Sequence, residues 1–359
     1  MILPVVDRAA GLFPYGATGR LLGRIVLFCL VLLPWSQAVM AGNSDLIPMT
    51  VSVPGPRNLS YLPVDLIPMI GADRAEGVKL TLTHTGGGGV ALEHMATGKS
   101  DCAVAGMPAH LSLRINDQGV VTLAAVNDAP LFVLVVRAGL AGRVRTPADL
   151  KGRVIGVNAG SLVSKTTSQQ LAELVLKNDG LEPGDVKIVP VGQDWEQQSS
   201  AIENGKVDAI MGDEPFASRL LHEGKVFFLV NLADPSTTRR LPGSNFLHAA
   251  LACRPDMVAR EPDKARRMVA IIRRALVWIA GHTPGEVVAT LGILNPEEKN
   301  SLIDALKKHP HAFSKDGKFS TRQLQETQLF FRTANSQNAL ARALVIENSV
   351  DDRWAGRRD

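Results

Sequence analysis

Short apolar runs alternate with helix-like stretches along most of this chain. Apolar runs rich in β-branched residues predict strands, and apolar residues three or four positions apart predict helices. The run at residues 131–136 is almost continuously apolar, as in a strand buried on both faces of a sheet. The pattern predicts strands at residues 49–53, 78–83, 102–105, 120–126, 131–136, 154–157, 186–191, 207–211 and 226–230. It predicts helices between them, at residues 62–70, 90–97, 146–152, from 161 to 178, and 195–204.

Beyond about residue 255 the strand signal weakens and helical periodicity takes over. Helices are predicted at residues 262–280, 296–308, 320–333 and 339–345. Alternating strands and helices followed by helices alone indicate an α/β fold with a mixed, mostly parallel sheet in each half and a helical C-terminal portion.

One pattern occurs twice. A Gly-Lys-x-Asp sequence begins at Gly98 and again at Gly205, and each leads through an apolar run to a proline, Pro108 or Pro215, at the same spacing. We expect each glycine to end a helix in the left-handed conformation and each proline to open the next helix at its first position. The repeat therefore predicts two similar α/β lobes, with a ligand site in the cleft between them.

The N-terminal residues 1–41 have the features of a secretory signal peptide. Arginines precede an uncharged apolar run at residues 25–33, and Val39-Met40-Ala41 supplies small residues at the spacing of a cleavage site. The alternative is a retained membrane anchor, but the run is shorter than the roughly 20 residues that span a bilayer.

Composition excludes some partners. The formal net charge is only +4 in 359 residues, which gives no reason to expect nucleic acid or an anionic membrane surface as a partner. After removal of residues 1–41 two cysteines remain, Cys102 and Cys253. The sequence leaves open whether they pair, and two buried free thiols are the simpler interpretation.

Two glycine-containing loops are candidate ligand contacts. Gly86 and Gly87 begin a run of four glycines before a predicted helix, whose N-terminal amides could bind a polar group. No Lys-Ser/Thr follows the run, which excludes a nucleotide P-loop. In the second loop Gly160 permits close approach of a ligand, and Ser161 is expected to cap the helix that starts there and to hydrogen-bond the ligand. Plain turns are the alternatives for both loops.

Asp213 and Glu214 follow a predicted strand directly. In an open α/β sheet the carboxyl ends of the strands face the cleft, so we expect both acids there. The matching residues of the first repeat, Met107 and Pro108, are apolar. The site would be apolar on one wall and acidic on the other, unless one acid serves only as a helix cap.

The remaining candidates are single residues. Asn58 and Tyr61 follow the first strand, and Asp194 and Trp195 end another, where Trp195 could stack on a ligand or simply hold its helix in place. His248 precedes an apolar run, and a structural histidine is the alternative there. The chain has no Gly-x-Ser-x-Gly, His-Glu-x-x-His or Cys-x-x-Cys sequence, so we predict no catalytic residues, metal or cofactor.

The order of these motifs resembles the substrate-binding proteins of ABC importers of the nitrate, sulfonate and taurine type. The resemblance extends over about residues 47–352. The matching segments are residues 56–63 (Pro-Arg-Asn-Leu-Ser-Tyr-Leu-Pro), 98–101 with Pro108, 149–157 with Gly160-Ser161, 205–209 with Pro215, and the tail 346–351.

The resemblance implies a type II periplasmic-binding fold with two lobes that close over a ligand. Two crossover strands would join the lobes, near residues 131–137 and 246–252. Lobe one would comprise residues 44–132 with 250–359, and lobe two residues 133–249.

The resemblance also implies a function. It predicts a periplasmic, monomeric solute-binding protein that delivers a small molecule to an ABC permease in the inner membrane. Two adjacent acids would repel an anion, so the sequence favours a neutral or cationic ligand over a sulfonate or nitrate. The alternatives are an enzyme on the same fold, of the pyrimidine- or menaquinone-precursor type, and a periplasmic ligand sensor without a transport role.

The signal-peptide interpretation predicts a mature N-terminus at Gly42, because cleavage follows Ala41. The mass of the protein recovered from the exported fraction measures this directly. A mass that still includes residues 1–41 would contradict the prediction.

Overall fold

The computed structural model describes residues 46–238 and 241–358. The predicted signal peptide, residues 1–41, lies outside these ranges. Within them, no helix combines the length and the apolar character needed to cross a bilayer.

The first of two five-stranded sheets has the strand order β2-β1-β3-β10-β4. Its strands are β1 (Ile47–Val53), β2 (Val78–His84), β3 (Cys102–Gly106), β4 (Val121–Asn127) and β10 (Ala249–Cys253). Strand β1 pairs in parallel with β2 and β3, whereas β10 is antiparallel to both β3 and β4. One strand from late in the chain is thus inserted into a sheet that is otherwise built from the first part.

The second sheet repeats this topology with the order β7-β6-β8-β5-β9. Its strands are β5 (Phe132–Arg137), β6 (Val154–Asn158), β7 (Lys187–Val191), β8 (Ala209–Asp213) and β9 (Val226–Asn231). Strand β6 is parallel to β7 and β8, and β5 is the antiparallel insertion between β8 and β9. The predicted α/β fold with two similar, mostly parallel sheets is confirmed. The exact lobe boundaries stay a prediction.

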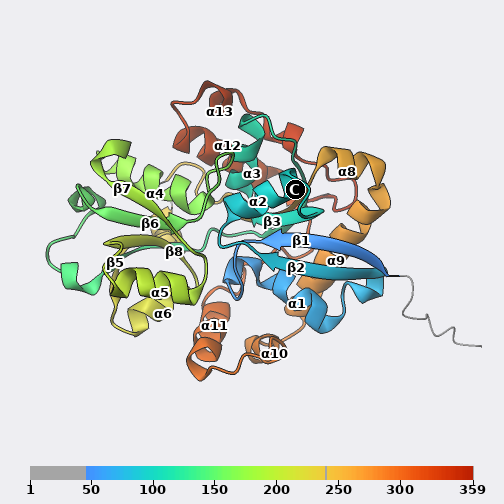
Figure 1. Cartoon of the computed structure of the whole chain (residues 1–359), viewed down its shortest axis with the longest axis horizontal. Helices are drawn as coiled ribbons and strands as arrows, with labels where there is room; N and C mark the ends of the chain where they lie inside the picture. Colours follow the sequence, from blue (N-terminus) through green and yellow to red (C-terminus); the bar gives the residue numbers. More distant parts are fainter. Residues whose placement is uncertain (1–45, 239–240, 359) are drawn as a thin grey trace, which may run out of the picture. The chain divides into compact units, whose positions relative to one another are not determined.

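Helices pack around both sheets (Figure 1). Helices α1 (Leu62–Ile70), α2 (Gly88–Ala96) and α3 (Met107–Ile115) follow strands of the first sheet, and α4 (Thr167–Asn178), α5 (Trp195–Glu203), α6 (Phe216–His222) and the short α7 (Pro235–Thr238) follow strands of the second. Along β5, Phe132 and Leu134 pack in one core cluster with Leu171 of α4, while Val133 and Val135 pack in another that includes α5 and α6. The continuous apolar run of β5 is therefore explained by burial on both faces.

The C-terminal part is mainly helical. It contains α8 (Pro255–Arg260), α9 (Pro262–Ala280), α10 (Pro284–Thr290), α11 (Pro296–Lys308), α12 (Thr321–Ala334) and α13 (Ala339–Ala343). The long α9 packs Met268 and Ile272 into the core of the first sheet. The sequence pattern missed α8 and α10, and also a two-stranded pair of very short strands, β11 (Phe319–Ser320) and β12 (Arg357–Arg358).

The repeated Gly-to-Pro pattern has the predicted geometry in most respects. Gly98 and Gly205 both follow a helix with left-handed φ angles of 79° and 65°. Pro108 lies in the first turn of α3, as expected. Pro215 differs, because it is the N-cap of α6 rather than its first residue.

Cys102 and Cys253 form a disulfide, so the interpretation as free thiols is wrong. Their Cα atoms are 4.3 Å apart because the two residues face each other in the antiparallel register of β3 and β10. That register could not be read from the sequence, since the cysteines are 151 residues apart. The disulfide fastens the inserted strand β10 to the first sheet.

We expect the free energy of unfolding of the double variant Cys102→Ala/Cys253→Ala to be about 3–5 kcal/mol lower than that of the wild type, because the disulfide closes a long loop in the unfolded chain. Urea unfolding measures the difference. A reducing agent should cause the same loss in the wild type and none in the variant. Equal stability of variant and wild type would show that the sheet alone fixes β10.

Candidate functional site

The carboxyl ends of several strands from both sheets meet in a group of buried polar side chains, which we call the inner polar cluster. It consists of Asn58 after β1, Asn158 at the end of β6, Gln193 after β7, Asp213 at the end of β8, and His248 before β10. Each of these side chains is at most 2% exposed. Contributions from both sheets make the cluster the natural candidate for a ligand site in this topology.

Several polar atoms of the cluster make no well-aligned hydrogen bond among the described residues. They are Asn58 Nδ2, Asn158 Oδ1, Gln193 Nε2, Asp213 Oδ1 and both ring nitrogens of His248. A buried polar group without a partner costs about 1–3 kcal/mol. Several such groups in one place are unusual in a structural core, and they fit a ligand that carries both donors and acceptors.

Asp213 dominates the electrostatics of the cluster. Its Oδ2 accepts a 2.9 Å hydrogen bond from Asn158 Nδ2. Burial raises the pKa of Asp213 to about 7, and the amides of Asn158, Gln193 and Asn58 only partly offset this rise. A ligand that donates a hydrogen bond to Oδ1, or that carries a positive charge, would stabilise the ionised carboxylate.

Aromatic rings form another side of the cluster. The ring of His248 lies 5.0 Å from that of Phe132, nearly at a right angle, and 6.0 Å from that of Tyr61. Burial, together with the nearby His110, lowers the pKa of His248 to about 3, so its ring is neutral at physiological pH. Burial also raises the pKa of Tyr61, and the charge of Asp213 adds to this. Tyr61 thus adjoins His248 of the cluster, and both side chains are uncharged at physiological pH.

Glu214 has other partners than Asp213, so the structure does not show the expected wall of two acids. Its carboxylate accepts hydrogen bonds from Ser218 Oγ at 2.7 Å and Ser218 N at 3.2 Å, and Lys308 Nζ of α11 lies 3.5 Å away. Adjacent residues at a strand end point in opposite directions, so only one of the two acids can face the cluster. Glu214 accepts from Ser218 in the first turn of α6, which is close to the alternative interpretation of one acid as a helix cap.

The loop at Gly160 and Ser161 also differs from expectation. Helix α4 begins only at Thr167, and Thr166 is its N-cap, with its side chain accepting from Gln169 N. Ser161 is not a cap. Its amide donates to Ser164 O at 3.0 Å, and its hydroxyl accepts weakly from Val163 N at 3.3 Å, so these groups serve the loop itself.

The glycine run after β2 contacts this loop directly. Gly86 has a left-handed φ of 80°, and its amide donates to Pro54 O. The carbonyl oxygen of Ala159 would lie only 2.1 Å from a Cβ atom added at Gly87. Backbone atoms of the two glycine loops thus meet at Gly87 and Ala159, where no room is left for a ligand.

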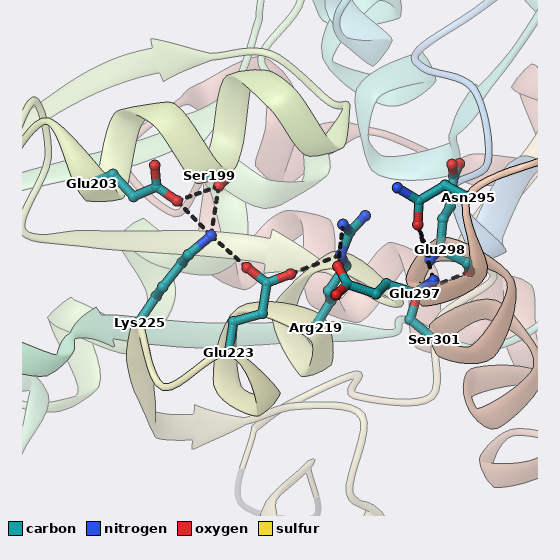
Figure 2. Close-up of polar contacts among 9 residues, drawn as sticks. All are labelled: Ser199, Glu203, Arg219, Glu223, Lys225, Asn295, Glu297, Glu298 and Ser301. Carbon is teal, nitrogen blue, oxygen red and sulfur yellow. Dashed lines mark hydrogen bonds and ion pairs between the residues drawn. The ribbon is translucent and has the colours of Figure 1, made fainter.

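Asp194 and Trp195 have local roles in this structure. Asp194 caps α5 by accepting from Gln197 N. The Trp195 ring lies under the guanidinium of Arg219, whose Cζ is 3.7 Å from the ring centroid. Arg219 Nε also pairs with Glu223 at 3.0 Å, and its Nη2 lies 3.5 Å from Glu297 of α11. Figure 2 shows Arg219 with Glu223 and Glu297. The contact between Arg219 and Trp195 supports the alternative that Trp195 holds its helix in place.

Met107 and Pro108 are buried at the start of α3. The amide of Met107 donates to His248 O at 2.5 Å, which fixes the backbone of His248. The carbonyl of Pro108 accepts from Gln170 Nε2 of α4 at 3.0 Å. The bond of Met107 thus joins two segments of the first sheet, and that of Pro108 joins α3 to α4 of the second-sheet side.

Asn158 and Gln193 were missed by the sequence analysis. Both follow parallel strands, so the rule that ligands bind at the carboxyl ends of strands could have found them. Asparagine and glutamine are common in loops, however, and nothing in the sequence marks these two as buried.

The pKa of Asp213 predicts how stability depends on pH. In the unfolded chain the carboxyl loses its proton near pH 3.8, whereas in the folded protein it keeps the proton up to about pH 7. Folding therefore takes up a proton in this window, and the free energy of unfolding falls as pH rises through it. Because asparagine does not titrate, the stability of Asp213→Asn relative to wild type should rise by up to about 4 kcal/mol across the window.

Urea unfolding at several pH values tests this. Asp149→Asn is the matched control, because backbone hydrogen bonds from Arg145 and Thr146 lower the pKa of Asp149. Above about pH 5 that carboxylate is ionised in both the folded and the unfolded state. The free energy of unfolding of Asp149→Asn relative to wild type should therefore change little with pH. An equally constant difference between Asp213→Asn and wild type would contradict the raised pKa of Asp213.

A family model described as NMT1/THI5 like matches residues 74–286. A comparison with curated protein sequences finds no match. Among solved structures, a protein from Bordetella bronchiseptica RB50 has a TM-score of 0.78 and 22% identity, covering 87% of this chain and 96% of its own.

Two further structures have the same fold. The alkanesulfonate-binding protein SsuA from Xanthomonas axonopodis pv. citri, bound to MOPS, has a TM-score of 0.67 and 17% identity over 86% of this chain and 99% of its own. The desulfurization enzyme DSZB has a TM-score of 0.54 and 17% identity over 86% of this chain and 97% of its own. At these identities the likeness shows the fold, which is that of the periplasmic binding proteins. Since the family model covers more than half of the sequence, the chain belongs to the NMT1/THI5-like family.

Proposed function

We propose that this protein is a periplasmic solute-binding protein, which captures a small molecule at the inner polar cluster between two closing lobes. The single observation that carries the proposal is the set of buried, unpartnered polar atoms where both sheets end. The family and the fold support it, because SsuA, of the same fold, is named an alkanesulfonate-binding protein. We further propose that the protein is a monomer that delivers its ligand to an ABC permease.

The chemistry of the cluster supports a neutral or cationic ligand. Among the described residues Asp213 Oδ1 makes no well-aligned hydrogen bond, and the side chain is fully buried. A ligand with an N–H donor would supply the missing hydrogen bond, while a sulfonate or nitrate would add repulsion. The amides of Asn58 and Gln193 lie close enough to Asp213 to lower its pKa, and because each carries two N–H donors, one of them would bind an acceptor atom of the same molecule.

An enzyme is the second candidate function, because DSZB shares the fold. The cluster gives weaker support to it. Tyr61 and His248 could transfer protons, but burial moves the pKa of each away from neutrality. A binding role requires only hydrogen bonds from these residues, so it is the simpler proposal.

The first experiment identifies what the protein binds. Protein purified without a refolding step is denatured, and the released small molecules are identified by mass spectrometry. We expect one molecule with hydrogen-bond donors in stoichiometric amount, and its affinity is then measured by calorimetry. Chemical conversion of that molecule on incubation with the protein would favour the enzyme.

Asp213→Asn should bind the copurifying molecule about 10–150-fold more weakly, the equivalent of roughly 1.5–3 kcal/mol for a charge-assisted hydrogen bond. Glu214→Gln is the matched control, because the carboxylate of Glu214 is already bonded to Ser218 and lies near Lys308. Its affinity should change little. Wild-type affinity in Asp213→Asn, or tight binding of inorganic sulfate or nitrate by the wild type, would overturn the charge argument.

A further inference from the structure

Three glycines of the first-sheet side lie against backbone atoms of the second-sheet side. A Cβ atom at Gly55 would be 1.9 Å from Gln193 O, one at Gly87 would be 2.1 Å from Ala159 O, and one at Gly89 would be 2.6 Å from Ser164 O. Gly55 follows β1, and the other two are at the start of α2. We call these three contacts the glycine seam.

The seam lies immediately outside the inner polar cluster. Gln193, whose carbonyl faces Gly55, is itself a member of the cluster and is 1% exposed. A surface groove of about 400 Å³ borders the seam, with Gly55, Gly86, Ala159, Gly192 and Asp194 among its lining residues. Gly55 therefore borders the groove and also contacts Gln193 of the buried cluster.

The contacts are between backbones, so they leave no flexible side chain to move aside. Ordinary contact of a Cβ atom needs about 3.4 Å or more, and the distances at Gly55 and Gly87 fall short by more than 1 Å. Ala159 directly follows β6, and Gly87 directly precedes α2, so neither can move far alone. An added Cβ atom is most simply accommodated when the first-sheet side and the second-sheet side move apart as rigid bodies.

We propose that the glycine seam is a backbone-to-backbone seal that sets how completely the two lobes close. This inference rests on the proposed function in one respect, that the lobes open and close. A side chain at Gly55, Gly87 or Gly89 then holds the lobes apart and leaves the inner polar cluster open to water. The seal also keeps the ligand at the cluster, because it leaves no room for one between Gly87 and Ala159.

Gly87 offers a clean substitution. Its φ is 176°, an extended conformation that alanine adopts without strain, so Gly87→Ala acts only through the seam. The neighbouring Gly88→Ala is the matched control. A Cβ atom there would be 3.6 Å from Ala105 Cβ of its own side, which is ordinary contact.

Hydrogen exchange of the protein without added ligand measures the opening. In Gly87→Ala, peptides covering residues 58–61, 190–194 and 246–249 should exchange about tenfold faster or more, while Gly88→Ala should match the wild type. Small-angle scattering should give a larger radius of gyration for Gly87→Ala alone. Gly55→Ala is the second variant and should behave in the same way if Gly87→Ala does not fold.

Two results would overturn the seal. One is unchanged exchange and radius in Gly87→Ala and Gly55→Ala. The other is an equal increase in Gly87→Ala and Gly88→Ala, which would indicate local loosening of α2. Because no ligand is used, the result is separate from that of the proposed function: opening in Gly87→Ala together with no copurifying molecule would support the seal and reject solute binding.

Discussion

The insertion of one antiparallel strand into each sheet is the constraint on which the rest of this structure depends. Strand β5 leaves the first part of the chain and enters the second sheet, and β10 returns to the first. Each insertion fixes a residue of the site, since Phe132 begins β5 and His248 immediately precedes β10. The disulfide between Cys102 and Cys253 and the hydrogen bond from Met107 N to His248 O both secure the returning strand.

These insertions bring unlike chemistry to one place. The first-sheet side supplies Asn58, Tyr61 and His248, which are neutral, and the second-sheet side supplies the acid Asp213 with Asn158 and Gln193. Burial of an acid with one free oxygen is unfavourable unless something donates to it. Polar atoms of the cluster that make no hydrogen bond destabilise it. Only a ligand whose donors and acceptors match these atoms removes that cost, and this makes the site selective.

Glycine has a different part in the same arrangement. At Gly55 and Gly87 it brings backbones from the two sides closer than any side chain would allow. A close backbone contact excludes water from the cluster, and a drier site strengthens each hydrogen bond in it. The polar cluster and the glycine seam are thus two aspects of one closed state, the first giving selectivity and the second giving exclusion of solvent.

Local periodicity determined most of the secondary structure. The helices at residues 62–70, 262–280 and 296–308 have the bounds that the pattern predicted, because long amphipathic runs and proline starts are properties of neighbouring residues. The repeated Gly-to-Pro pattern likewise revealed two similar halves, since a left-handed glycine after a helix is a local requirement. Asn58, Tyr61, Asp213 and His248 could be named from their places after or before strands.

What the sequence could not determine depends on contacts between distant residues. The pairing of Cys102 with Cys253 follows from the register of β3 and β10, and that register is set only when the sheet forms. Asp213 and Glu214 are adjacent and chemically alike in the sequence. Their different roles were decided by the pleat of β8 and by Ser218 and Lys308, which happen to lie on one side of it. Similarly, Gly87 and Gly88 are identical locally, and only the approach of Ala159 from the other sheet distinguishes them.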